Sequence, residues 1–463
     1  MPDRWPDGRL TRTAIGVTAV FSAALLATRL WAVWLSPLAS DGAIFLAVGR
    51  AILNGLHPYR DLFETKPPGI FLLASLSQIF GGAGAAKAFS VLAILTVLAS
   101  CLWVDRTFGF FAGTLLALLT AIGSGGFYPE EFGAAALCVY VAAVAGNPTG
   151  RWTPCVAIAA LWVALLFKEP FMLAALAVAI LLLRERRTFV RLYVLPQVVA
   201  VVLFAVTLAS LGILREYFTL YLPFMFGVRV GGAENTGLWM MARDLFWFSP
   251  IFLPLILACG AREAARLGLL RVGAAILLLV AACLLGKYSG YHGTTAVPVY
   301  MAMIMGSRRE GWALPAVLAA VLAVPLASGL NPPASQNPGW TEDREIAHAI
   351  DGILDRCSLG RYYNLGGPSY VYGFTRHSPT GPLLYLELFM LQDPYLVSQT
   401  LANLKGTDLI LFQNKASALH IEKEYYDLAE VEVAKSFQTN PWPCAEQSIR
   451  SDRFILLFRK GAR

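Results

Sequence analysis

The sequence predicts a polytopic α-helical membrane protein with about eleven transmembrane helices, followed by a small C-terminal α/β domain outside the membrane. Three observations predict this fold class: the composition, a series of apolar runs bounded by charged residues, and a change of composition after Leu330. The chain has 463 residues, of which 57% are hydrophobic and 14% are charged. Soluble domains carry about 25% charged residues, so this composition is typical of a membrane protein.

The apolar runs define the expected helices in order along the chain. The first run, 13–35, is long enough to span a bilayer and lacks the flanks of a cleaved signal peptide, so we expect a retained transmembrane helix. The stretch 67–80 is apolar but short and is followed by glycines, which favours an interfacial or re-entrant helix. The other expected spans are 84–104, 108–124, 132–146, 154–167, 170–183, 190–211, 246–260, 272–286, 293–306 and 312–329.

Basic residues predict the orientation, because the cytoplasmic ends of spans carry an excess of Lys and Arg. With the N-terminus in the cytoplasm, the inner ends hold fourteen basic residues and the outer ends hold nine. The clusters "RERRTFVR" (184–191) and "GSRRE" (306–310) are then both inside. An odd number of spans in the inner (plasma) membrane puts the C-terminal domain on the extracytoplasmic side. The net charge of +7 is spread along the chain rather than concentrated in an aromatic-rich basic block, which excludes nucleic acid as an expected partner.

After Leu330 the chain becomes less apolar, and this change sets the expected domain boundaries. We expect a transmembrane module over 1–330 with a first extracytoplasmic loop at 36–83, a Pro/Asn/Ser-rich linker at 331–340, and an α/β domain at 341–463. Within that domain, 341–356 has helical periodicity. The segments "RYYNLG", "DLILF", "VEVAKSF" and "RFILLFR" alternate or run apolar like short strands. Cys357 and Cys444 lie in this domain, where they could form a disulfide in an oxidising compartment or be buried separately.

The expected topology places the polar motifs of several loops together on the outer face. These motifs are the segment from Asp41 to Lys66, "YPEE" (128–131), "KEP" (168–170), "REYF" (215–218), "GGAENTG" (231–237) and "KYSGYHG" (287–293). Carboxylates and cations at one membrane surface suit a transfer reaction on an amphipathic donor, because a base must activate the acceptor hydroxyl and cations must stabilise a phosphate leaving group.

Asp41 follows the first expected span directly, between Ser40 and Gly42. A carboxylate flanked by small residues can approach a substrate hydroxyl and remove its proton. The alternative is that Asp41 is the N-cap of an amphipathic helix that follows it, and the two roles are compatible.

Lys66 precedes two prolines that favour the start of a helix at Pro68. An ammonium group there, beside the N-H groups of a helix N-terminus, suits a phosphate close to the bilayer. A lysine that merely reaches from the interface to water is the alternative. Lys168 and Lys287 are the other candidate phosphate ligands.

Glu130 and Glu131 end the "YPEE" motif at the outer lip of the bilayer, where a charge is costly unless it is paired or wet. We expect one of them in the catalytic site. With Asp41 they could hold a divalent cation (Mg or Mn) or orient a sugar hydroxyl; no cofactor is required by the sequence. Four further residues are candidate substrate contacts, although a histidine in a loop is more often structural: Tyr59, Glu64, Tyr291 and His292.

Two of these motifs resemble those of a known superfamily. The first-loop Asp41, the segment "NGLHPYRDLFETKPPG" (54–69) and the later "YPEE" are similar to motifs of the GT-C polytopic glycosyltransferases, in the branch of the aminoarabinose transferases and the bacterial relatives of protein O-mannosyltransferases. The similarity covers roughly 13–330 in architecture and extends to the outer C-terminal domain. In contrast to the family pattern, Asp41 is followed by Gly42 and Ala43 rather than by a second acid.

The resemblance implies an inverting hexosyl- or pentosyltransferase that uses a polyprenyl-phosphate-linked sugar. Asp41 would be the catalytic base, Glu130 or Glu131 the second acidic site, and Lys66 a ligand of the donor phosphate. The acceptor would be an envelope lipid, polysaccharide or protein. A lipid-sugar flippase or transporter is the main alternative, although transporters place ionisable residues near the bilayer midplane. A ligase that attaches a polymer to a lipid is the third reading.

Overall fold

A computed structural model of the chain describes residues 9–36, 38, 40–123, 126–229, 268–284, 290–307, 315, 317–321, 338–365, 369–384, 393–413, 433, 435–445 and 454–461. The chain divides into two compact units. The first unit consists of 1–37, 88–204 and 235–334, and the second consists of 38–87, 205–234 and 335–463. Each unit is described by itself.

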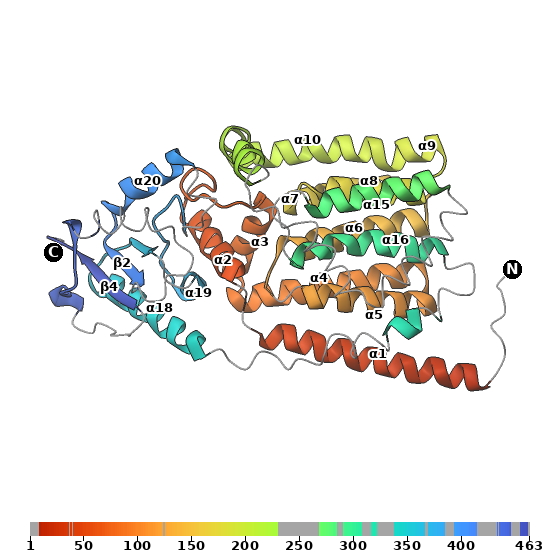
Figure 1. Cartoon of the computed structure of the whole chain (residues 1–463), viewed down its shortest axis with the longest axis horizontal. Coiled ribbons are helices and arrows are strands. Elements are labelled where there is room, and N and C mark those ends of the chain that lie inside the picture. Colours follow the sequence, from red (N-terminus) through yellow and green to blue (C-terminus); the bar gives the residue numbers. More distant parts are fainter. Residues whose placement is uncertain are drawn as a thin grey trace. The chain divides into compact units, whose positions relative to one another are not determined.

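The first unit is a helical bundle (Figure 1). Four described helices are long and apolar enough to cross a membrane: Thr13–Leu35, Ala83–Val104, Pro129–Gly146 and Arg186–Ser210. The helices that carry residues of this unit are α1 (Arg9–Leu35), α4 (Ala83–Val104), α5 (Arg106–Gly123), α6 (Pro129–Gly146), α7 (Thr153–Phe167), α8 (Phe171–Leu182), α9 (Arg186–Phe189), α10 (Leu195–Ser210), α15 (Leu269–Leu284) and α16 (Val297–Ser307). A π-helical turn, Val190–Val194, joins α9 to α10, and a 3₁₀ segment, Gly290–Ala296, precedes α16.

These helices match the apolar runs closely. Every expected span that lies within the described residues is helical, and the described part of 312–329 (residues 315 and 317–321) is helical too. The expected span 246–260 lies outside the described residues, so the total of about eleven stays a prediction.

Small residues allow the helices of this bundle to approach each other closely. A Cβ placed on Gly109 of α5 would lie 2.2 Å from the carbonyl oxygen of Cys101 in α4. A Cβ placed on Gly133 of α6 would lie 2.1 Å from the ring of Phe171 in α8. Such small-residue contacts are typical of helix interfaces in membranes, where packing rather than the hydrophobic effect drives association.

The second unit combines two short helices of the first loop with a sheet. The helices α2 (Ser40–Leu53) and α3 (Pro68–Ile79) pack together, and α3 begins at Pro68 as expected. The C-terminal part contains α18 (Pro338–Arg356), β1 (Tyr362–Leu365), α19 (Tyr370–Phe374), α20 (Pro394–Leu404), β2 (Leu409–Gln413), β3 (Phe437–Gln438) and β4 (Phe454–Arg459).

The sheet has the strand order β1-β2-β4-β3, with β1 and β2 parallel and the other pairs antiparallel. Its core contains Tyr363, Leu365, Leu404 and Ile410. The first loop belongs to this unit rather than to the helical bundle, because the N-H of Phe63 donates to the carbonyl of Pro382 at 2.8 Å.

The expected strand "VEVAKSF" (431–437) is wrong for most of its described part. Val433, Lys435 and Ser436 are helical, and the strand β3 begins at Phe437. The pairing of β3 starts opposite Arg459, where β4 ends. The N-H of Lys460 still donates to the carbonyl of Ser436 at 2.9 Å, but the chain then turns at Gly461, whose φ of 73° ends the extended run that could pair with the residues before Ser436.

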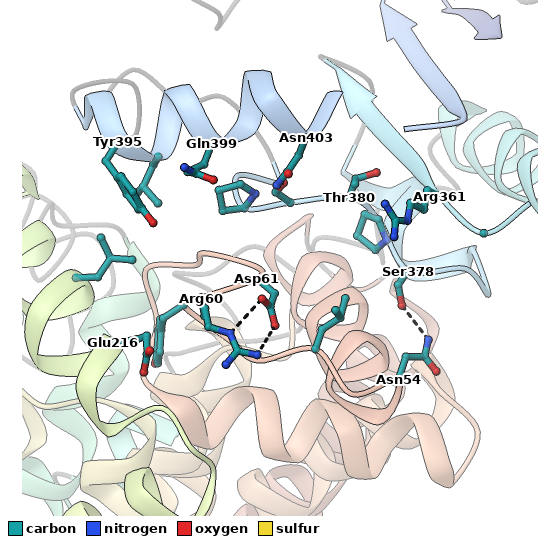
Figure 2. A pocket seen from close by; sticks show the side chains of 18 of the residues that line it. Asn54, Arg60, Asp61, Glu216, Arg361, Ser378, Thr380, Tyr395, Gln399 and Asn403 are labelled. Carbon is teal, nitrogen blue, oxygen red and sulfur yellow. Dashed lines mark hydrogen bonds and ion pairs between the residues drawn. The ribbon is translucent and has the colours of Figure 1, made fainter. Parts of the chain in front are cut away.

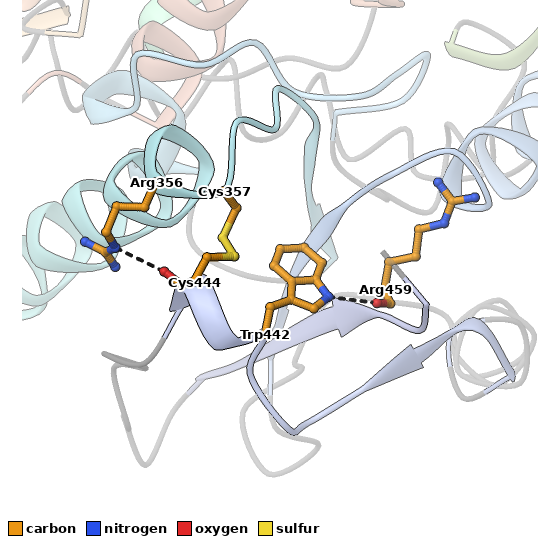
Figure 3. Close-up of a disulfide and its surroundings, with 5 residues drawn as sticks. All are labelled: Arg356, Cys357, Trp442, Cys444 and Arg459. Atoms are coloured by element: carbon orange, nitrogen blue, oxygen red, sulfur yellow. Dashed lines mark hydrogen bonds between the residues drawn. A yellow bond between two sulfur atoms is a disulfide. The ribbon is translucent and has the colours of Figure 1, made fainter. Parts of the chain in front are cut away.

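A disulfide joins the end of α18 to a short 3₁₀ segment, Pro443–Ala445 (Figure 3). It links Cys357 to Cys444, which are 87 positions apart in the sequence. Beside it, the indole N-H of Trp442 donates to the carbonyl of Arg459 at 2.9 Å, and Arg356 donates to the carbonyl of Cys444 at 3.3 Å. These contacts attach both β4 and α18 to the segment that contains Trp442 and Cys444.

Candidate active site

Asp41 lies in the first turn of α2, which begins one residue earlier at Ser40. It is therefore inside the first turn of the helix rather than at its N-cap. In that turn its negative charge is still stabilised by the positive end of the helix dipole. The helix is held on two sides. A Cβ on Gly49 would lie 2.5 Å from the backbone of Ala74 in α3, and a Cβ on Gly373 of α19 would lie 3.1 Å from the Cβ of Ala43. The two glycines thus allow α2 to pack directly against α3 and α19.

Tyr370, which interacts with Asp41, and its neighbour Asp343 were not predicted from the sequence. Burial, together with the nearby carboxylates of Asp343 and Asp41, raises the pKa of the half-buried Tyr370. Asp343 is itself buried, with 4% exposure. Because Tyr370 and Asp343 come from the C-terminal domain, more than 300 positions beyond Asp41, no local pattern could have associated them with it.

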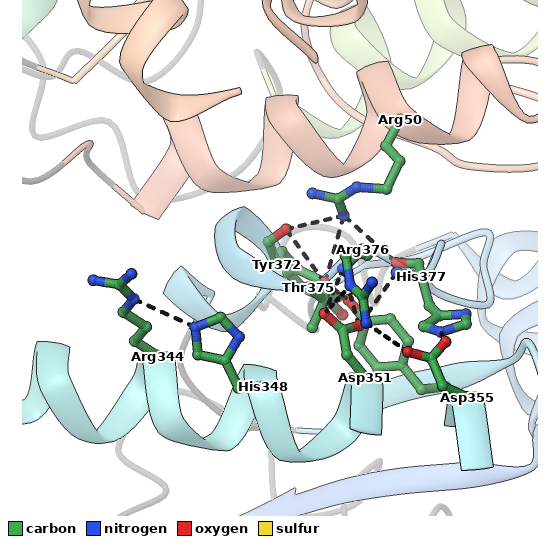
Figure 4. A network of polar contacts seen from close by, with 10 residues as sticks. Arg50, Arg344, His348, Asp351, Asp355, Tyr372, Thr375, Arg376 and His377 are labelled. Atoms are coloured by element: carbon green, nitrogen blue, oxygen red, sulfur yellow. Dashed lines mark hydrogen bonds and ion pairs between the residues drawn. The ribbon is translucent and has the colours of Figure 1, made fainter. Parts of the chain in front are cut away.

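Arg50 anchors the other end of α2 to the C-terminal domain (Figure 4). Its guanidinium donates to the carbonyls of Tyr372 and His377 at 3.3 and 3.5 Å and to the hydroxyl of Thr375 at 3.4 Å. Burial lowers the pKa of Arg50, and the neighbouring Tyr362 partly opposes this shift. A partly buried cation that donates to main-chain carbonyls fixes the helix that carries Asp41.

The segment that accepts hydrogen bonds from Arg50 is itself fixed by two acids in the same unit. Both oxygens of Asp351 accept hydrogen bonds from the N-H of Arg376 at 2.9 Å, and Asp355 pairs with the side chains of Arg376 and His377 at 2.5 and 2.9 Å. These bonds hold the segment whose carbonyls accept from Arg50 (Figure 4).

The loop between α2 and α3 buries its charged residues. Glu64 and Lys66 are 2% and 6% exposed, and the side chain of Glu64 accepts from the N-H of Thr65 at 2.7 Å. Tyr59 is fully buried, has a left-handed φ of 66°, and donates to the carbonyl of Lys66 at 2.6 Å. Backbone strain at a non-glycine residue is typical of functional sites. The interfacial-lysine alternative is therefore weakened for Lys66, because it lies inside the folded loop just before the N-terminus of α3.

In the first unit, Glu130, Lys168 and His292 come together. The ammonium of Lys168 forms an ion pair with Glu130, and the Nε2 atom of His292 lies 3.4 Å from the same carboxylate oxygen. The side chain of Glu130 is fully buried, and that of Lys168 is 12% exposed. The observed partner of Lys168 is thus an acid, and its binding of a donor phosphate stays a prediction.

Glu131 has a different environment from Glu130. Its side chain accepts from the N-H of Tyr128 at 3.1 Å and so closes the N-terminus of α6. The preceding Phe127 has a left-handed φ of 65°, which turns the chain into the helix. Glu130 instead pairs with Lys168 and lies near His292.

Two other candidate residues cannot be placed. Lys287 lies outside the described residues, and the side chain of Tyr291 is likewise outside them. Among the residues that are described, no group of three or more His, Cys, Asp or Glu side chains is arranged to hold a metal ion.

Comparisons with known proteins identify the fold. The structure is similar to ArnT from Cupriavidus metallidurans bound to undecaprenyl phosphate, with a TM-score of 0.63 and 14% identity. The match covers 96% of this chain and 98% of that chain. The chain has the fold of ArnT. The apo state of the same protein matches with a TM-score of 0.64.

The similarity to ArnT confirms the expected polytopic α-helical fold class. An oligosaccharyltransferase from Archaeoglobus fulgidus matches at 13% identity over 92% of this chain and 71% of that one, with a TM-score of 0.46. No family model and no curated protein matches the sequence.

Proposed function

We propose that this chain is a membrane glycosyltransferase that transfers a sugar from a polyprenyl-phosphate donor to an envelope acceptor at the extracytoplasmic face. The observation that carries the proposal is the ArnT fold over nearly the whole chain, combined with Asp41 and Lys66 at the starts of two helices that pack together. The neighbour that binds undecaprenyl phosphate supports a polyprenyl-phosphate donor for this chain. The proposed orientation has the N-terminus in the cytoplasm.

In the proposed reaction, Asp41 accepts the proton of the acceptor hydroxyl as the acceptor oxygen bonds to the anomeric carbon. The bond from that carbon to the phosphate oxygen breaks, and the polyprenyl phosphate leaves with the bonding electrons. A single displacement of this kind inverts the anomeric configuration. Lys66 stabilises the phosphate charge, with Lys168 and Lys287 as further candidate ligands.

The remaining candidate residues complete the proposal. Glu130 is the second acidic group, with Glu131 fixing its helix, and the sugar is contacted by Tyr59, Glu64, Tyr291 and His292. A divalent cation is not assigned a step, because the described acidic residues form no metal-binding group. Activity before and after chelation tests a role for Mg or Mn.

The test is a transfer assay with the full chain in lipid nanodiscs, using undecaprenyl-phosphate-linked sugars and envelope fractions from a deletion strain as acceptors. Asp41→Asn and Asp41→Ala should both abolish transfer while membrane insertion is unchanged. Transfer that persists in both variants would refute the assignment of the base. Movement of labelled lipid-sugar across vesicles without covalent transfer would favour a flippase instead.

A further inference from the structure

A large polar cleft lies within the second unit, and the proposed base and phosphate ligand, Asp41 and Lys66, do not line it. Its volume is about 1130 Å³, which exceeds the usual size of a small-molecule site. The first loop, the segment 215–220 and the C-terminal domain line it (Figure 2). The described residues that line it include Tyr59 but not Asp41, Glu64 or Lys66.

One wall of the cleft is a face of α20. Tyr395, Gln399 and Asn403 are spaced four residues apart, so their side chains lie along one side of the helix, and Figure 2 shows them directed toward the first loop. The side chain of Asn403 donates to the carbonyl of Gly381, which fixes its amide. Tyr395 is 61% exposed and presents its ring to the cleft. An exposed aromatic ring beside amide groups suits a saccharide, whose faces are apolar and whose edges carry hydroxyl groups.

The cleft also carries an excess of positive charge. Four arginines line it, against the two acids Asp61 and Glu216. Arg60 pairs with Asp61 at 3.2 Å, and Arg376 pairs with acids of α18. Among the described residues, neither Arg215 nor Arg361 has an ion-pair partner. Guanidinium groups of this kind bind carboxylate or phosphate with paired hydrogen bonds.

A second polar group in the cleft also points to a ligand. One carboxylate oxygen of Glu216 is buried and has no hydrogen-bond partner among the described residues. Buried polar atoms are rarely left unsatisfied, because the lost hydration costs free energy. A hydroxyl group of a bound sugar is a donor of the right kind for this oxygen.

We propose that this cleft binds an anionic oligosaccharide portion of the acceptor. Tyr395 stacks on a sugar ring, Gln399, Asn403 and Glu216 bond to hydroxyl groups, and Arg215 and Arg361 bind the anionic substituent. The description of this ligand as an acceptor rests on the proposed glycosyltransferase function. The binding itself follows from the cleft alone.

The first experiment measures binding of trigalacturonate and of neutral maltotriose to the full chain in nanodiscs. The wild type should bind trigalacturonate more tightly, with an affinity that falls as salt is raised. The double variant R215Q/R361Q should weaken trigalacturonate binding roughly tenfold or more, because two charged hydrogen-bonding groups are lost. Tyr395→Ala should weaken binding of both sugars. Arg344→Gln changes an exposed arginine of α18 that does not line the cleft and is the matched control.

Several outcomes would overturn the inference: no trigalacturonate binding by the wild type, equal binding of the two sugars, or equal losses in R215Q/R361Q and in the control. Unchanged thermal midpoints show that the variants fold. If they do not, Tyr395→Ala and Gln399→Ala, which leave every arginine in place, test the cleft against the same control, and the salt dependence of trigalacturonate binding by the wild type tests the role of charge.

A second measurement separates this inference from the proposed function. In the transfer assay, R215Q/R361Q should raise KM for an anionic acceptor several-fold with little change in kcat. Binding without any transfer would remove the glycosyltransferase proposal and leave the cleft as a glycan site. Transfer with binding that the cleft variants do not alter would remove the cleft inference alone.

Discussion

Lys168→Met tests whether the Glu130 carboxylate depends on its lysine partner. In the structure Glu130 is fully buried, and one of its oxygens is occupied by Lys168 with His292 3.4 Å away. The other oxygen is buried and has no hydrogen-bond partner among the described residues. Methionine has a similar length to lysine but no charge, so the variant leaves the carboxylate in place with its main counter-charge removed.

The expected cost follows from this geometry. Removing one partner of a buried ion pair costs about 3–5 kcal/mol, because the remaining charge stays desolvated. For a unit of this size a loss of about 1 kcal/mol lowers the thermal midpoint by about 2 °C, so we expect a decrease of roughly 6–10 °C. The double variant E130Q/K168M removes both charges and should regain most of this loss.

The assay is thermal unfolding of the full chain in nanodiscs, with Lys405→Met at an exposed position as the control. If the thermal midpoint of Lys168→Met equals that of the wild type, the dependence of Glu130 on Lys168 is refuted. The transfer activity of E130Q/K168M then separates two roles. A stable but inactive double variant assigns the pair to the reaction, whereas a stable and active one makes the pair structural.

Three further predictions concern the second unit. Cys357→Ser should destabilise the second unit by about 4–5 kcal/mol in the chain-entropy model, because the bridge to Cys444 spans 87 positions. Reductant should lower the thermal midpoint of the wild type equally, and an unchanged midpoint would contradict this. Arg50→Gln should lower kcat more than it changes KM for the donor. Arg50→Lys should also have a low kcat, because lysine lacks the planar guanidinium group with its several N-H donors. Full activity in either variant would exclude a positioning role for Arg50. Burial alone would raise the pKa of Asp61, but hydrogen bonds from Arg60 and a main-chain N-H outweigh it and lower the pKa below 3.8. The stabilisation by Asp61 is therefore present above about pH 4 and lost as pH falls through the lowered pKa, so the midpoint difference between wild type and Asp61→Asn should shrink in acid; a constant difference would refute this.

The local features of the fold were predictable from sequence, and the long-range ones were not. Hydropathy located the described spans, and Pro68 marked the start of α3, because both signals act over a few neighbouring residues. The alternation in "VEVAKSF" also predicted a strand, but the end of β4 at Arg459 removes the partner that most of that strand would need.

The candidate site shows the same division. The motifs identified Asp41, Lys66 and Glu130 as candidates because their charges stand out against an apolar chain. They could not show that Arg50 reaches main-chain carbonyls more than 320 positions away, or that Tyr370 lies near Asp41. Those associations depend on how the C-terminal domain packs on the first loop, which no periodicity or spacing encodes.

The contact of Gly373 with Ala43 has a practical consequence for chimeric proteins. A cut at the expected linker, 331–340, would exchange α19 while leaving behind the α2 surface, where a Cβ at position 373 would lie only 3.1 Å from that of Ala43. A transplant of 335–463 alone should therefore displace the helix that bears Asp41, even if both parts fold. An exchange of substrate preference between relatives should succeed only when 38–87 and 335–463 are transferred as one cassette.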